Sequence, residues 1–263
     1  MLGRKTKKGS ADDDEAADSP EESAAPDKKR RRRGKQETEV NTLTEWIKSL
    51  VVAFVLFIVI RTFLLQTFVI TSGSMEGTLL VGDMLVANRA AIGARIPGTQ
   101  AHAPGYSRPK RGEVWVFDPH HEIDMKLVKR LMGLPGDTLE MRGATLFLND
   151  QALDEPYVNS NTGQDDRHPD FEWQREHLVA GVDRDSYVPS RHHWGPIVIP
   201  DGHYFMLGDN RDESLDSRYW GLLESWRLGG RVVFTYFSYN ADSYRPFPAL
   251  REIRWNRVGR GVH

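Results

Sequence analysis

The stretch RVVFTYF at residues 231–237 is the longest of six short runs enriched in β-branched, aromatic and aliphatic side chains. Gly, Pro, Asp and Asn residues bound these runs, and no long helical period separates them, which is typical of strands joined by turns. The sequence therefore predicts a mainly β fold built on an antiparallel β-sheet. The other five expected strands are residues 84–87, 113–117, 126–129, 138–141 and 145–148.

The strand pattern is interrupted from about residue 150 to residue 195. This stretch is polar and rich in Asp, Arg, His and Pro. Because it offers few apolar side chains for a core of its own, we expect an inserted, loop-rich subdomain over 150–195. The insertion divides the expected β domain into a first part, residues 66–149, and a second part with a tail, residues 196–263.

A strongly apolar segment precedes the β domain. Every residue from Leu50 to Ile60 is apolar, and the run resumes after Arg61. A membrane span needs about 20 residues, and Trp46, Lys48 and Arg61 are residue types found at bilayer interfaces. We therefore expect one transmembrane helix over residues 43–65, with a buried core helix as the alternative. A cleaved secretory signal is disfavoured, because no small-x-small site closely follows the run.

The first 42 residues are almost entirely charged or small and polar, which predicts a disordered arm. Acidic residues 12–15 are followed by a basic run at 28–35, directly before the apolar segment. Positive charge on that side predicts a single-pass cell-membrane protein with a cytoplasmic N-terminus and an extracytoplasmic β domain. Contact with the lipid bilayer explains the basic run better than nucleic acid does, because the net charge of -2 gives no global signal for nucleic acid.

The chain contains no Cys, which excludes disulfides, thiolate metal sites and cysteine nucleophiles. A Ser-His-Asp hydrolase is an alternative, but there is no Gly-x-Ser-x-Gly elbow, and His120, His121, His192 and His193 lie in polar, loop-like stretches. Residues 118–124 contain several Asp, Glu and His, yet their spacing fits no single strand or helix face. We expect neither a metal nor a cofactor.

Four segments occur in a fixed order behind the apolar run. Together they resemble type I signal peptidases, the Ser/Lys proteases also called leader peptidases, over roughly residues 46–239. The resemblance implies a membrane-bound serine endopeptidase that removes signal peptides from exported preproteins, close to the protein translocation machinery. The segments are Ser72-Gly-Ser-Met-Glu-Gly-Thr-Leu79, Gly82-Asp83, Lys129-Arg-Leu-Met-Gly-Leu-Pro-Gly-Asp137 and Gly208-Asp-Asn-Arg-Asp-Glu-Ser-Leu-Asp-Ser-Arg-Tyr-Trp-Gly221.

The resemblance assigns the nucleophile to Ser74 and the general base to Lys129. A serine hydroxyl is a poor nucleophile until a base takes its proton, and a lysine can do so only when it is neutral. Burial among apolar groups disfavours the ammonium form and brings catalytic lysines to a pKa of about 7 to 8. Lys126 lies outside the matching motif, and we expect it to be solvated.

The same resemblance implies supporting roles for four further positions. The Ser72 hydroxyl and the Ser74 amide would stabilise the oxyanion, and such donors contribute about two to three orders of magnitude in rate. Ser214 would orient the lysine, and Asp216 and Arg218 would form a supporting ion pair. We interpret residues 209–212 as scaffold.

An extended signal peptide can bind as an added strand beside a sheet edge, with alternate side chains in pockets. The family's edges match residues 68–71 and 126–129. Shallow pockets would admit only small side chains at the first and third positions before the cut, which implies Ala-x-Ala specificity. The residues expected to line these pockets are Phe68, Ile70, Met75, Leu79 and Val128.

The sequence departs from the family pattern at four positions. Gly77 replaces a usual proline, Thr67 and Thr71 replace common prolines, and Glu213 replaces a usual asparagine. Glycine in place of proline predicts a less rigid loop after the nucleophile.

Two further alternatives concern function. A self-cleaving repressor would share the dyad, but it needs a helix-turn-helix and no membrane segment. A catalytically silent, membrane-anchored envelope-binding protein could use the same scaffold. The presence of both Ser74 and Lys129 argues against that second alternative.

Overall fold

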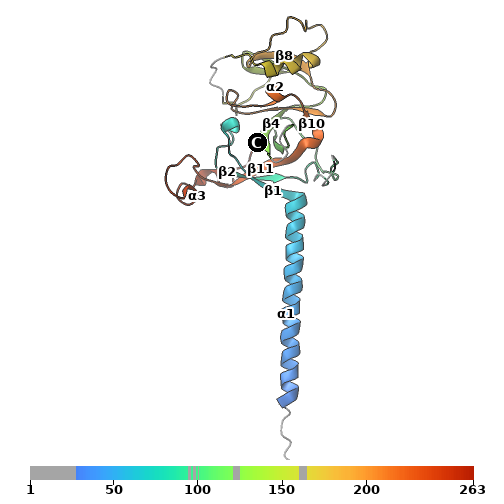
Figure 1. The fold of residues 1–263 in the computed structure, drawn as a ribbon, viewed down its shortest axis with the longest axis vertical. Helices are drawn as coiled ribbons and strands as arrows, with labels where there is room; N and C mark the ends of the chain where they lie inside the picture. Colours follow the sequence, from blue (N-terminus) through green and yellow to red (C-terminus); the bar gives the residue numbers. More distant parts are fainter. Residues whose placement is uncertain (1–27, 94–95, 97–98, 100, 121–124, 160–164) are drawn as a thin grey trace, which may run out of the picture. The chain divides into compact units, whose positions relative to one another are not determined.

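A computed structural model describes residues 28–93, 96, 99, 101–120, 125–159 and 165–263, and for residues 28–41 and 62 it describes the backbone alone. The chain divides into two compact units, residues 1–53 and 54–263 (Figure 1). The second unit holds all of the β structure, so it is the unit that carries the motifs identified above.

Helix α1 spans Lys28–Val59 and is followed by a π-helical turn, η1, at Ile60–Leu64. Its part from Thr42 to Val59 is apolar and long enough to cross a membrane, and none of this part is buried. The expected span of 43–65 ends too late, because Leu65 already begins a strand. Residues 28–42 of the expected disordered arm are helical, since Lys, Arg, Glu and Gln favour helices. Residues 1–27 lie outside the described part of the chain.

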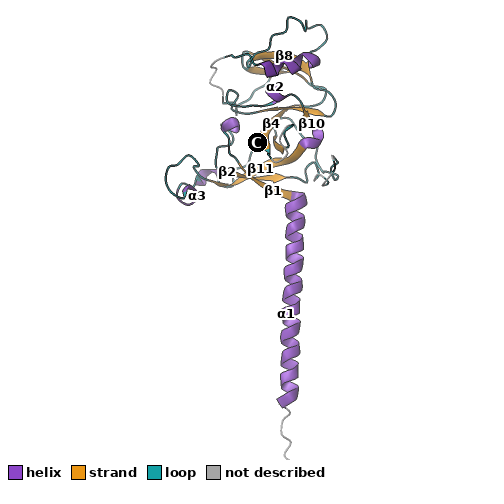
Figure 2. Ribbon diagram, in the orientation of Figure 1, coloured by secondary structure: helices purple, strands orange, loops and turns teal. Residues whose placement is uncertain are grey.

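A seven-stranded antiparallel sheet forms the larger part of the second unit, with strand order β1-β2-β11-β3-β4-β9-β10 (Figure 2). It confirms the mainly β, antiparallel fold that the strand pattern predicts. Its strands in chain order are β1 (Leu65–Val69), β2 (Asp83–Asn88), β3 (Val114–Phe117), β4 (Leu127–Gly133), β9 (His203–Leu207), β10 (Leu223–Glu224) and β11 (Leu228–Ser238).

A smaller antiparallel sheet has the order β7-β6-β5-β8, with β5 at Thr138–Arg142, β6 at Thr145–Leu148, β7 at Gln151–Ala152 and β8 at His193–Val198. This sheet begins before residue 150 and ends after residue 195, so the expected insertion boundaries cut through it. Leu178 and Trp194 also share a core with Leu139 and Phe205. The insertion is therefore packed into the domain through its few apolar side chains.

The two faces of the large sheet bury different clusters. Val114 and Val116 belong to one cluster, while the alternate residues Trp115 and Phe117 belong to another, as the two-residue period of a strand requires. The first cluster also contains Met75 and neighbours from the loop that follows β1. That loop therefore covers one face of the sheet.

Short helical turns make up the remaining regular structure. The 3-10 turn η2 lies between β1 and β2, and the C-terminal residues after η5 pair with β11, where Thr235 N–H donates to Arg260 O at 2.9 Å. The turns are η2 (Gly73–Met75), η3 (Pro169–His177), α2 (Ser217–Trp220), η4 (Ser225–Arg227), α3 (Pro248–Arg251) and η5 (Trp255–Arg257).

Candidate active site

Ser74 lies in η2, on the loop that connects the edge strand β1 to β2. The loop is closed at its base, where Ile70 N–H donates to Asp83 O at 2.8 Å and Gly82 N–H donates to Ile70 O at 2.9 Å. Gly82 has φ +91°, and a Cβ there would approach Tyr239 O to 2.2 Å, so only glycine fits. These contacts fix the turn that presents Ser74.

Lys129 lies on β4 opposite Trp115 of β3, and its side chain is almost fully buried, with 3% of its surface exposed. Its Nζ is hydrogen bonded to Ser74 Oγ. Burial lowers the pKa of Lys129 to about 8, against the opposing charge of Asp216. The structure therefore brings the two predicted dyad residues together and gives the lysine the environment that a neutral base needs.

Lys126 differs from Lys129 in both exposure and partner. It lies just before β4, its side chain is 37% exposed, and it forms an ion pair with Asp118. Lys126, which lies outside the motif, is thus the exposed lysine, and Lys129, which lies within it, is the buried one.

Ser72 lies beside Ser74, with its Oγ 3.4 Å from Ser74 Oγ. Ser214 is buried, and among the residues described its Oγ has no hydrogen-bond partner. The bond from Ser214 to Lys129 that the resemblance implies is not formed here. Ser214 nevertheless lies next to the site, because a Cβ on Gly208 would come within 2.1 Å of Ser214 Oγ and 2.5 Å of Ser74 O.

Asp216 and Arg218 form the expected ion pair at 2.8 Å, and neither side chain is exposed. Burial alone would raise the pKa of Asp216, but the charge and hydrogen bonds of Arg218 lower it below its ordinary value. Asp216 also accepts a bond from Gly208 N–H at 3.1 Å, and Arg218 donates to Arg211 O at 2.6 Å. The pair therefore holds together the loop from 208 to 218 behind Ser74.

A second buried ion pair lies beside the first. Arg130 donates to Asp209 through Nε at 2.8 Å and Nη2 at 2.6 Å, and it also donates to Thr78 Oγ1 at 3.1 Å. The ring of Tyr157 stacks on the Arg130 guanidinium at 3.7 Å. Sequence reasoning gave Tyr157 no role, because nothing in the polar stretch around it indicates a partner 27 residues earlier in the chain.

The five side chains expected to contact substrate belong to one apolar cluster, in which Ile70, Met75 and Leu79 are buried while Phe68 and Val128 are partly buried. Strand edges are open nearby. Among the described strands, β1 pairs only with β2, and β4 pairs with β9 only from Arg130 onward. Two backbone edges are thus available for an added strand.

Gly77 is held in place by the insertion. It has φ +112°, which proline cannot adopt, and a Cβ there would lie 2.9 Å from Tyr157 O. The replacement of proline by glycine therefore allows a close contact between the loop that carries Ser74 and residues 157–159.

The alternative sites do not assemble in the part of the chain that the structure describes. Ser190 Oγ donates to Asp165 at 2.8 Å, and the His193 ring also contacts Asp165, but the bonds between Ser190 and His193 go to backbone groups and none joins the Ser190 hydroxyl to the His193 imidazole. A Ser-His-Asp triad needs the histidine between the other two. Within the described ranges, no group of three or more His, Asp or Glu could hold a metal ion. His121, Glu122 and Asp124 lie outside those ranges.

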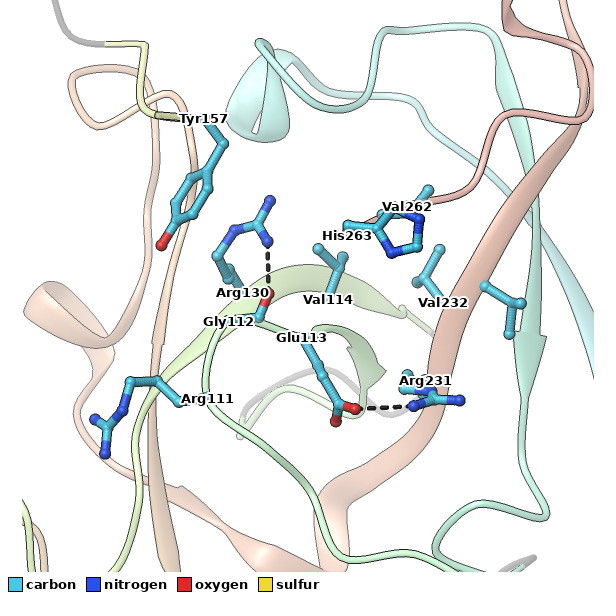
Figure 3. A pocket seen from close by; sticks show the side chains of 11 residues that line it. Arg111, Gly112, Glu113, Val114, Arg130, Tyr157, Arg231, Val232, Val262 and His263 are labelled. Carbon is cyan, nitrogen blue, oxygen red and sulfur yellow. Dashed lines mark hydrogen bonds and ion pairs between the residues drawn. The ribbon is translucent and has the colours of Figure 1, made fainter. Parts of the chain in front are cut away.

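A separate pocket of about 470 Å³ lies where the C-terminal residues run beside β11 and the start of β3 (Figure 3). Its lining includes Val114, Tyr157 and Val262, with an ion pair between Arg231 and Glu113 at 2.9 Å. Neither Ser74 nor Lys129 lines it. The pocket is therefore distinct from the candidate dyad.

Comparisons with known proteins place the chain in a family. Residues 43–237 match the family model described as signal peptidase, peptidase S26. The chain is 38% identical over 233 residues to a signal peptidase I of Pseudomonas aeruginosa, covering 82% of this chain and 78% of that protein. It is 33% identical over 207 residues to a signal peptidase I of Bacillus licheniformis, covering 78% and 95%.

A solved structure of a signal peptidase I from Enterococcus faecalis has 29% sequence identity and a TM-score of 0.31, over 48% of this chain and 97% of that one. The family model and the two relatives, each of which covers most of the chain, suffice for the assignment. The protein belongs to the signal peptidase family, peptidase S26, whose members are serine endopeptidases.

Proposed function

We propose that this protein is a membrane-anchored endopeptidase that removes signal peptides from exported preproteins with Ser74 as nucleophile and Lys129 as general base. The observation that carries the proposal is the buried hydrogen-bonded contact between these two side chains. A buried lysine with a pKa near 8 is partly neutral at physiological pH, and only the neutral amine can accept the serine proton.

In the proposed reaction, the neutral Lys129 amine takes the proton of Ser74 while Ser74 Oγ bonds to the carbonyl carbon of the scissile peptide. The carbonyl π electrons move to the oxygen, which becomes an oxyanion. The Lys129 ammonium then protonates the leaving amine as the peptide C–N bond breaks, leaving an acyl-enzyme ester. Water, deprotonated by Lys129, hydrolyses the ester and restores Ser74.

The oxyanion requires donors, and the Ser72 hydroxyl and the Ser74 amide are the groups that we assign to it. Ser72 lies 3.4 Å from the nucleophile oxygen, which supports the assignment. We assign Ser214 to orienting Lys129 and the Asp216–Arg218 pair to holding the surrounding loop. The burial of all three residues, with Ser214 and Asp216 beside Gly208, supports these roles.

Specificity would come from the open edges of β1 and β4, between which an extended signal peptide would lie and complete the backbone hydrogen bonds. Phe68 and Val128 would contact small side chains, because the cluster behind them is already filled by Ile70, Met75 and Leu79. This arrangement supports cleavage after Ala-x-Ala. A direct test incubates the full-length protein in detergent with a preprotein and maps the cut by mass spectrometry.

We expect cleavage after the Ala-x-Ala site of the parent preprotein, and loss of cleavage when the residue before the cut is changed from Ala to Leu. The control preprotein carries the same Ala to Leu change at the middle position of the site, which should still be cut. Binding without cleavage would instead indicate a catalytically silent envelope protein. Equal cleavage of all three preproteins would contradict the proposed pockets.

The apolar part of α1 would anchor the protein in the bilayer, with the N-terminus in the cytoplasm. This is supported by the exposed apolar surface from Thr42 to Val59 and by the basic run just before it. Protease added to intact spheroplasts should digest the region after Ile70 and spare an N-terminal epitope tag. Protection of the C-terminal domain in the intact spheroplasts, with digestion after their lysis, would reverse the orientation.

A further inference from the structure

Asn210 contacts both peptide groups that flank Ser74. Its side-chain Nδ2 donates to Gly73 O at 3.1 Å, and its backbone N–H donates to Ser74 O at 3.2 Å. The two donors come from one residue on the loop after β9, 137 positions from Gly73 in the chain. Asn210 thus forms hydrogen bonds with the η2 turn on both sides of Ser74.

The bond to Gly73 O has a consequence for the amide of Ser74. The Gly73 carbonyl and the Ser74 N–H belong to one peptide group, which is planar and trans, so the two bonds point in opposite directions. A donor that fixes the carbonyl therefore also fixes the direction of the N–H. A carbonyl that accepts hydrogen bonds also polarises its peptide group and makes the N–H a stronger donor.

Gly73 O has a second donor, the Glu76 N–H at 2.9 Å, which belongs to the same turn. That local bond forms within η2 and cannot by itself orient the turn relative to the rest of the site. Asn210 supplies the link to the sheet, since its loop is held by the buried Arg130–Asp209 and Asp216–Arg218 pairs.

We propose that Asn210 is the positioning residue for the oxyanion site: by holding the Gly73–Ser74 peptide group, it aims the Ser74 N–H at the developing oxyanion. This inference rests on the proposed function of Ser74 as nucleophile. The role requires an amide side chain, because a carboxylate of the same shape offers only acceptors and would face the carbonyl oxygen of Gly73. The proton transfer to Lys129 does not depend on it.

The test compares full-length Asn210→Asp and Asn210→Ala with the parent in detergent. If the Ser74 N–H no longer points at the oxyanion, the transition state loses stabilisation while substrate binding does not. We therefore expect kcat to fall about 10- to 100-fold while KM stays within about twofold. In Asn210→Ala, which adds no charge beside Lys129, the pH midpoint of kcat/KM should not move. The matched control is Asn159→Ala, which should leave kcat unchanged. Asn159 is exposed, and its backbone N–H donates to Asp209 O, a bond that the substitution leaves intact.

A second measurement separates positioning from general damage. A substrate-like peptide aldehyde forms a hemiacetal with Ser74 whose oxygen occupies the oxyanion position, whereas the uncleaved peptide with a reduced scissile bond has no such oxygen. Binding of the aldehyde should weaken by the same factor as kcat, and binding of the reduced peptide should not change. If Asn210→Ala fails to fold, Asn210→Asp, which keeps the volume, decides the outcome.

Three results would overturn the inference: kcat within twofold of the parent, a loss that lies entirely in KM, or equal weakening of both peptide ligands. Failure of the proposed function would look different. Cleavage by Ser74→Ala would overturn the nucleophile itself, whereas an inactive Ser74→Ala beside a fully active Asn210→Asp would reject only the role of Asn210.

Discussion

The side chains of Ser74 and Lys129 are hydrogen bonded although 55 positions separate them in the chain. One stands in a short turn after the edge strand and the other in the middle of the same sheet. In the neutral state of the lysine the hydroxyl would be the donor and the amine the acceptor. The contact therefore has the geometry for direct proton transfer without an intervening group.

If Ser74 and Lys129 act together, the losses in kcat/KM caused by replacing each of them should not add. Ser74→Ala and Lys129→Ala should each lower kcat/KM for preprotein cleavage by at least about 10⁴-fold, and the double variant should be no worse than either, because the two residues act as a unit. The measurement is single-turnover cleavage with circular dichroism to verify folding. Lys126→Ala, in which an exposed ion pair with Asp118 is lost, should keep most activity. Losses that add would show that the residues act separately.

The rate should depend on pH through Lys129. Because burial brings the pKa of Lys129 to about 8, kcat/KM should rise with pH through a midpoint near that value. Lys126→Ala should leave the midpoint unchanged. A rising limb centred near the ordinary lysine pKa of about 10.4 would mean that another group is the base.

The same pKa shift should appear in stability. Between about pH 8 and the unfolded-state pKa of about 10.4, the unfolded chain binds more protons at residue 129 than the folded chain, so the free energy of unfolding should rise with pH across this window. Below this pH window, burial of the charged Lys129 lowers the free energy of unfolding by its full amount, on the order of 3 kcal/mol. Lys129→Met should remove the penalty and match or exceed the parent's stability at pH 7, measured by chemical denaturation. Lys126→Met is the control, and a parallel gain there would contradict the burial argument.

Gly208 should tolerate no side chain. Its Cβ would lie 2.1 Å from Ser214 Oγ and 2.5 Å from Ser74 O, so Gly208→Ala should displace the nucleophile turn and lower kcat/KM by about 100-fold or more. The control is Gly202→Ala, which meets no atom within 4 Å and has φ +75°. That change should cost about 1 kcal/mol of stability from backbone strain and leave kcat/KM unchanged. Comparable activity of the two variants would show that the close approach at Gly208 is not needed.

Asp83 and Arg257 should stabilise the loop that carries Ser74. Arg257 donates to Asp83 at 2.5 Å and to Thr78 O at 2.8 Å, joining the C-terminal segment to this loop. Asp83→Asn should destabilise the protein by about 3–5 kcal/mol, because it leaves the arginine charge buried without its partner. Arg245→Met is the control, since the Arg245 side chain is 74% exposed. Equal effects of the two changes in thermal unfolding would argue against a structural role for the buried pair.

The lowered pKa of Asp83 predicts that the protein loses stability at acidic pH. Burial would raise its pKa, but the bonds from Arg257, the Leu80 amide and Ser238 outweigh burial and lower it. A lowered folded-state pKa contributes stability above the unfolded-state pKa near 4, and this contribution is lost as pH falls through the folded value. The parent should therefore lose stability on acidification below about pH 4 more steeply than Asp83→Asn.

Local patterns in the sequence predicted six strands, and the resemblance carried by its motifs implied the candidate dyad. The alternation in residues 113–117 and 231–237 appears as β3 and β11, because side chains on a strand alternate between two faces whatever the partner strand is. Ser74 and Lys129 were identifiable because each lies within a contiguous motif. The strands β8 and β9 were not expected, since their sequences lie in or near the polar stretch, and β1 was expected only as the edge at residues 68–71 that the resemblance implies.

Only the tertiary structure decided the contacts between distant segments. The low pKa of Lys129 depends on burial by residues outside its motif. The stacking of Tyr157 on Arg130 joins the insertion to β4. The hydrogen bond from Asn210 to Gly73 O spans 137 positions. Such contacts leave no periodic or local signal, because each is made by one side chain reaching a backbone or charged group that folding brings near it. The sequence by itself determined which residues could do the chemistry, whereas the packing of β4, the insertion and the loop after β9 determined the environment in which they would do it.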